Sequence, residues 1–176
     1  MSEDERLKPL IDALRWHDDD SRLTRAARID WASSLYPPQG MVAGELVQLS
    51  LMEESRVCFV SGAFLGTILC ATSAVEHLLV AELEALGIFS NKTTLGPLIQ
   101  LAREAELVSP EILQRLEILN ELRNPVAHRR NPSHDSTLVN RLQKKAVHPN
   151  VLMEKDARFA MELMYEIFLL LLKPGA

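Results

Sequence analysis

An apolar pattern with a helical period runs through the middle of the chain and limits what the chain can fold into. Between residues 63 and 86, apolar side chains recur every three or four positions, at 64, 65, 68, 69, 75, 78, 79, 83 and 86. This period of 3.6 residues is typical of an α-helix with one face on a core, and Gly87 follows as a C-terminal stop. Because no stretch shows the alternation of a β-strand, the sequence predicts an all-α protein.

Breakers and capping residues predict the organisation of the chain. Pro9 suits the first turn of a short helix, Asp20 can cap a second one, and Pro37 would end it. We therefore predict an N-terminal helical extension over residues 1–40. The remainder, 41–176, is predicted to be an up-and-down helical bundle.

The bundle region carries further helix signals. Ser109 followed by Pro110 is a capped helix start, and Asn124 before Pro125 predicts a break or kink. Residues 129–150 have no clear period and are predicted to be a loop or lid. The predicted helices of the whole chain span 9–17, 21–36, 43–60, 63–86, 95–105, 110–124 and 155–172.

One uncharged stretch, residues 57–75, raises the alternative of a membrane span. Small and polar residues dilute its hydrophobicity, and Ser61-Gly62 predicts a tight turn that would cut it in two. We expect a buried core segment and no membrane span. The first residues, MSEDERLK, contain no apolar signal region, so we expect a cytoplasmic protein.

The charge of the chain is uneven. Its net charge is −5, which argues against general affinity for nucleic acid, but residues 122–150 hold six basic residues and one acid. A charge run of this kind is either a solvated face or an interaction surface. Cys58 and Cys70 do not have metal-ligand spacing, and the five histidines are scattered, so neither a metal nor another cofactor is expected.

The decapeptide ELRNPVAHRR, residues 121–130, lies beside this basic density. Histidine moves protons near neutral pH, and arginine is a permanent forked cation that matches phosphate oxygens. Arg123 and His128 together suit cleavage of RNA by its own 2′-hydroxyl. Arg129 and Arg130 would extend the cationic surface along the RNA backbone. The alternative is structural, because basic residues also favour a helix C-terminus.

In-line cleavage of RNA usually needs two proton-transfer groups, whereas the decapeptide offers one. A two-fold dimer would bring a second His128 into the same cleft. The last predicted helix, apolar almost all round, should be covered on two sides, and one of them would be the partner subunit.

These residues resemble the HEPN superfamily. The segment Arg123-Asn124-Pro125-Val126-Ala127-His128 matches its R-x4–6-H motif, and SRVCFVSGAFLGTILCATSAVEHLL is similar to its helix, glycine turn and second helix with an inward glutamate, here Glu76. The resemblance covers roughly residues 44–172. It implies a usually dimeric helical bundle, in which many members are metal-independent endoribonucleases of toxin–antitoxin, defence or CRISPR systems.

Carried over by position, the resemblance implies roles for individual residues. Arg123 and His128 would be the catalytic pair, and Asn124 would orient the phosphate or the histidine. Glu76 would hold Arg123 or the backbone of the motif, or would be a satisfied carboxylate without a role. RNA, a second copy of the chain and an antitoxin protein are the expected partners. The alternative function is a non-catalytic HEPN-like module that binds a nucleotide, an RNA or a protein.

Overall fold

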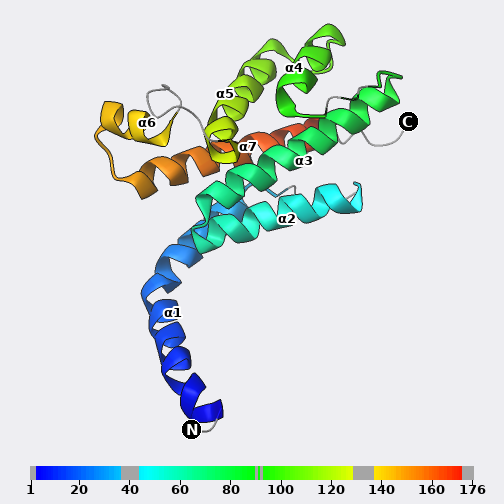
Figure 1. Cartoon of the computed structure of the whole chain (residues 1–176). Helices are drawn as coiled ribbons and strands as arrows, with labels where there is room; N and C mark the ends of the chain where they lie inside the picture. The colour runs from blue at the N-terminus through cyan, green and yellow to red at the C-terminus, as the bar shows by residue number, and fades with distance from the viewer. Residues whose placement is uncertain (1–2, 37–43, 90, 92, 129–136, 172–176) are drawn as a thin grey trace.

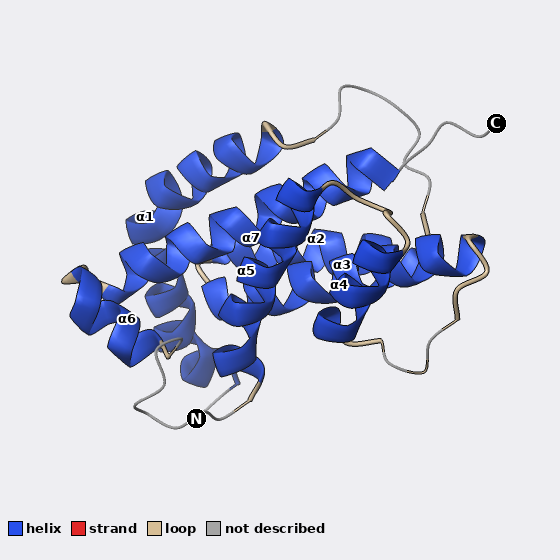
Figure 2. Ribbon diagram, turned by 90° about the horizontal axis from the view of Figure 1, so that it is seen from above, coloured by secondary structure: helices blue, strands red, loops and turns tan. Residues whose placement is uncertain are grey.

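The computed structural model describes residues 3–36, 44–89, 91, 93–128 and 137–171, and every regular element within them is a helix (Figure 1; Figure 2). The predicted all-α fold class is confirmed, and the helices form a bundle. The helices are α1 (Glu3–Ser33), α2 (Leu46–Ser61), α3 (Phe64–Ala85), α4 (Leu95–Glu104), α5 (Pro110–Ala127), α6 (Leu138–Lys145) and α7 (Pro149–Leu171).

Helices α2 and α3 form an antiparallel hairpin whose turn is Gly62. This glycine has φ +82° and donates its N–H to Phe59 O at 3.0 Å, as the predicted turn requires. The left-handed conformation favours a residue without Cβ. The space beside Gly62 is also occupied, because a Cβ there would lie 3.0 Å from Nη1 of Arg28.

The core lies between α3 and α7, the two central helices. Ten residues of α3 and eleven of α7 are buried, and α2 and α5 also pack on α7. Among the described helices α3 alone is long and apolar enough to cross a membrane by length and composition, and half of its most apolar window is buried inside the protein. The uncharged stretch 57–75 is thus cut by the turn at Gly62, as predicted.

Helix α7 differs from its prediction at the start and in what covers it. It begins at Pro149 rather than near residue 155, and its apolar face is covered by helices of the same chain. Leu169 and Leu170 near its end remain exposed, together with Val151 in its first turn. A partner subunit is therefore not needed to cover most of this helix.

At the N-terminus the prediction of two helices, 9–17 and 21–36, is wrong. One helix, α1, runs from Glu3 to Ser33 with Pro9 inside it. Proline removes only its own N–H from the helix, here a single bond near the helix start, so the helix continues. Asp20 does not cap a second helix and lies within α1.

The prediction of a loop or lid over 129–150 is also wrong in part. Its residues 138–145 form α6, where the Thr137 hydroxyl accepts a hydrogen bond from Asn140 N at 3.4 Å. Arg141 of α6 donates to Asp156 of α7 at 2.7 Å in a largely buried ion pair that fixes α6. Residues 129–136 lie outside the described part of the chain.

Candidate active site

The candidate site lies at the C-terminal end of α5, where Arg123 and His128 face each other. The Ser109 hydroxyl starts this helix by accepting from Ile112 N at 3.4 Å, as predicted. The predicted break at Pro125 does not occur. His128 N–H still donates to Asn124 O at 2.9 Å, so the helix ends only at His128, whose backbone is extended (φ −136°, ψ 135°).

The change of backbone direction at His128 brings its ring back toward the helix. Nη1 of Arg123 lies 3.2 Å from Nε2 of His128. Arginine has donors and no acceptor, so this contact is a hydrogen bond when Nε2 is unprotonated. That is the form of histidine able to take up a proton. His128 is exposed and Arg123 is half-buried, so the pair is open to a ligand.

The backbone carbonyl of Asn124 accepts the hydrogen bond from His128 N at the C-terminal end of α5. The predicted role of its side chain toward phosphate stays a prediction. Arg129 and Arg130, the other predicted substrate-binding residues, lie outside the described residues.

Glu76 of α3 lies next to the motif but bonds elsewhere. Its Oε1 accepts a hydrogen bond from Leu95 N, the first residue of α4, at 2.7 Å. The side chain of Thr94 does not cap α4, so the Glu76 carboxylate serves the helix N-terminus instead. Burial raises the pKa of the Glu76 carboxyl, while the hydrogen bond from Leu95 and the charge of Arg123 lower it. Glu76 therefore connects α3 to the start of α4, and the charge of Arg123 in α5 acts on its carboxylate.

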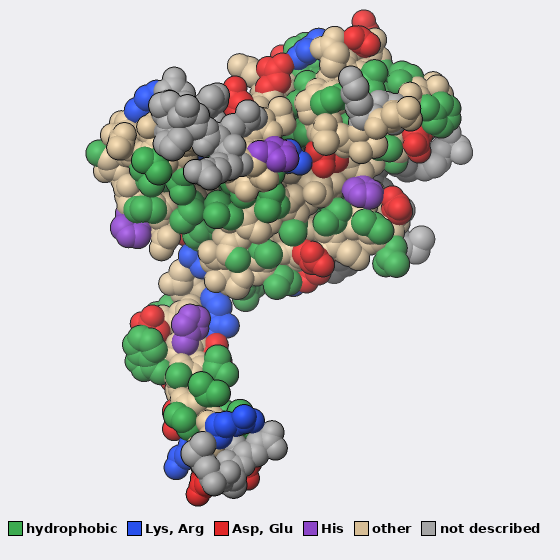
Figure 3. Space-filling model, viewed as in Figure 1, with side chains coloured by type: hydrophobic (Ala, Val, Ile, Leu, Met, Phe, Trp, Pro, Cys, Tyr) green, Lys and Arg blue, Asp and Glu red, His purple; other side chains and the backbone are tan. Residues whose placement is uncertain are grey.

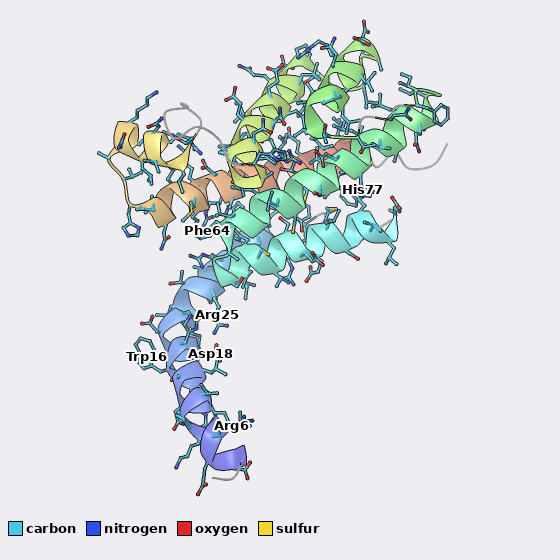
Figure 4. The ribbon with its side chains drawn as sticks, in the orientation of Figure 1. Arg6, Trp16, Asp18, Arg25, Phe64 and His77 are labelled. Atoms are coloured by element: carbon cyan, nitrogen blue, oxygen red, sulfur yellow. The ribbon has the colours of Figure 1, made fainter. Side chains whose placement is uncertain are left out.

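A small cavity of about 240 Å³ opens beside Glu76. Apart from Glu76, the residues that line this cavity were not predicted from the sequence. The signal that could have found them is helical spacing, since positions 73, 76, 77 and 80 lie on one helix face. His77 of α3, labelled in Figure 4, also contacts Glu45 (Nδ1–Oε2 3.5 Å). The cavity is lined by Ser73, Glu76, His77, Val80 and Thr93.

The positive charge around the motif is lower than the sequence suggests. Arg141, one of the six basic residues in 122–150, is used in its ion pair with Asp156. Within the described ranges, no group of three His, Cys, Asp or Glu is placed to hold a metal ion. The chemistry that the described site offers is therefore that of one arginine, one histidine and one partly buried carboxylate.

Substitutions of Glu76 should separate its hydrogen bond from its charge. Glu76→Gln keeps an oxygen for Leu95 N, whereas Glu76→Ala loses it, so the alanine variant should be less stable than the glutamine variant by about 0.5–2 kcal/mol. Chemical denaturation at pH 7 measures the difference. Equal stability of the two variants would show that the bond to Leu95 contributes nothing.

The raised pKa of Glu76 also predicts a pH dependence. The folded state holds the proton of this carboxyl more tightly than the unfolded state, so its contribution to stability grows as the pH falls through the folded pKa toward the ordinary value of 4.5. Wild type should gain stability relative to Glu76→Gln between pH 7 and about pH 4.5. A constant difference over this range would contradict the assignment.

Comparisons of the chain with protein-family models, curated proteins and solved structures give no match.

Proposed function

We propose that this protein is a metal-independent endoribonuclease of the HEPN type. The observation that carries the proposal is the 3.2 Å contact between Arg123 Nη1 and His128 Nε2. It places a proton acceptor and a permanent cation side by side on an exposed surface. These are the two groups that attack of a 2′-hydroxyl on the neighbouring phosphate requires.

The reaction follows from the chemistry of the two side chains. When the phosphate binds, Nη1 of Arg123 turns from His128 Nε2 to a phosphate oxygen, which leaves the single lone pair of Nε2 free. His128 Nε2 then takes the proton of the 2′-hydroxyl as the 2′-oxygen bonds to phosphorus. The bond from phosphorus to the 5′-oxygen breaks, and the 5′-oxygen takes up a proton. The N–H groups of Arg123 stabilise the charge on the phosphate oxygens. The products are a 2′,3′-cyclic phosphate and a 5′-hydroxyl.

The proton for the 5′-oxygen needs a second acid. In this proposal it comes from His128 of a second copy in a two-fold homodimer. Asn124, Arg129 and Arg130 bind the RNA backbone, and Glu76 keeps α4 and α5 in place around the pair. Such an enzyme works in the cytoplasm, without a cofactor, and an antitoxin protein is the partner that restrains it.

A single-stranded RNA in EDTA tests this proposal. Purified protein should cut it, and should leave uncut the same sequence with 2′-deoxy sugars at the mapped sites. Cutting of the deoxy substrate, or cutting only with added divalent metal, would contradict the mechanism.

One observation favours a second candidate, the non-catalytic HEPN-like module. Arg141 is held by Asp156, so it adds little to the positive surface that a nuclease uses to hold RNA. This candidate predicts that RNA stays intact at high protein concentration. It also predicts that the protein binds a nucleotide, RNA or protein in a manner sensitive to Arg123→Ala.

A further inference from the structure

The N-terminal half of α1 leaves the bundle as a protruding arm, residues 4–20 (Figure 1; Figure 3). Every residue of this arm is exposed. The C-terminal part of α1 is different, because Trp31 packs on Phe59 of α2 with ring centroids 4.7 Å apart. A helix this long without tertiary contacts along half of its length is not expected to be stable by itself.

The arm has one apolar stripe. Leu7, Leu10, Ile11 and Leu14 follow the spacing i, i+3, i+4, i+7, which puts them on one face of the helix. Leu10 and Leu14 are 58% and 66% exposed. Continued by the same spacing, this face passes Asp18, which is exposed and paired with Arg25. It then reaches Ser21, Arg25, Arg28 and Ala32, which lie against the bundle or are partly covered by it. The stripe thus extends a face that is already in contact with protein.

The surface area of the chain shows that much of it is left uncovered. A compact protein of 19.8 kDa would expose about 8,600 Å². This chain exposes 11,234 Å², an excess of about 2,600 Å² to which the arm contributes. A stable interface covers about 800 Å² on each partner, whereas the excess is a value for the whole chain, of which the arm is one part.

The charges of the arm indicate what covers the stripe. Asp12 is paired with Arg15 within the arm, and Asp18 and Asp19 are paired with Arg25 and Arg22 just beyond it. Arg6 and Lys8 near the tip, and Asp20 at the base, make no ion pair with another described residue. Figure 4 shows Arg6 near the free end of the arm and Asp18 farther along it, toward the bundle.

We infer that the arm pairs antiparallel with the arm of a second copy of this chain. In an antiparallel pair centred near residue 13, Arg6 of one arm lies opposite Asp20 of the other, and Lys8 lies opposite Asp19, whose carboxylate also pairs with Arg22 of its own helix. Helical spacing puts each of these pairs on the same flank of the apolar stripe, and the two equal flanks meet in an antiparallel pair. A parallel pair would instead place like charges together. The inference does not depend on nuclease activity.

The mass of the full chain in solution tests the pairing. Light scattering should give about twice 19.8 kDa for wild type. The double variant Leu10→Glu/Leu14→Glu should raise the dimer Kd at least about 1,000-fold, because four buried leucines are lost across the pair. Leu23→Glu is the matched control, since Leu23 is 84% exposed on the opposite face, and its Kd should not change. A monomeric wild type, or a dimer insensitive to the double variant, overturns the inference.

Charge reversal tests the antiparallel register. Arg6→Glu alone should raise the dimer Kd roughly tenfold, because it acts twice in a two-fold pair. Arg6→Glu combined with Asp20→Arg should return the Kd to near the wild-type value. If the combined variant is as weak as the sum of its two changes, the arms do not meet in this register. Helix content by circular dichroism confirms that each variant is folded. A wild type that has the mass of a dimer but does not cleave RNA would count against the nuclease alone and not against the pairing of the arms.

Discussion

His128→Ala should lower the rate of RNA cleavage by about 10²–10⁴-fold, the usual contribution of a positioned acid or base. The substitution removes the proton acceptor that lies 3.2 Å from Arg123. His128 is exposed and is the last residue to be held by α5, so the fold should not change. Single-turnover cleavage of one defined RNA in EDTA measures the effect.

His148→Ala is the matched control for this experiment. His148 is also exposed and accepts a hydrogen bond from the nearby backbone, from Asn150 N at 3.3 Å. Its removal should leave the cleavage rate within about twofold, as for an ordinary surface position. Equal rates for His128→Ala and wild type, with both proteins folded, would show that His128 is not the reacting group.

Phe59→Ala should reduce the free energy of unfolding by about 3–5 kcal/mol, the largest stability effect we expect. Phe59 of α2 is 0% exposed. Its ring lies 4.7 Å from that of Trp31 in α1 and 6.0 Å from that of Phe64 in α3, and the Arg158 guanidinium stands 5.2 Å above it. Truncation would leave a cavity where four helices meet.

Val57→Ala on the same helix is the control for Phe59→Ala, because Val57 is 51% exposed. It should cost about 0.5 kcal/mol or less. Urea denaturation of both variants measures the difference. A loss below 1 kcal/mol for Phe59→Ala would mean that the junction of α1 with the bundle is not packed as the structure shows.

Much of the bundle could be predicted because its helices carry strong local signals. The apolar period of α3, the turn at Gly62 and the start at Ser109-Pro110 each depend on a few neighbouring residues. Helix α6 could not be predicted in the same way, because it has eight residues and its anchor, the Arg141–Asp156 pair, joins positions fifteen residues apart. Pro9 and Pro125 misled the prediction, since each removes only one hydrogen bond near a helix end.

The candidate site, too, could be predicted only where its residues are close together in the sequence. The sequence predicted that Arg123 and His128 would act together, and the structure places them in contact. The role of Glu76 at the start of α4 could not be predicted, because Leu95 is nineteen residues away and no local pattern connects the two. In the sequence Arg141 is one of several basic residues in a run. Its partner, Asp156, lies in α7, and only the folded structure brings the two side chains together.

The ends that wild type leaves on RNA in EDTA test the central claim most directly. Mass spectrometry of the fragments should find 2′,3′-cyclic phosphate and 5′-hydroxyl ends, because only the RNA's own 2′-oxygen attacks in a site built from Arg123 and His128. Fragments with 5′-phosphate ends would contradict the proposed chemistry. Intact RNA, with a folded dimer at high concentration, would contradict the nuclease itself and favour the binding module.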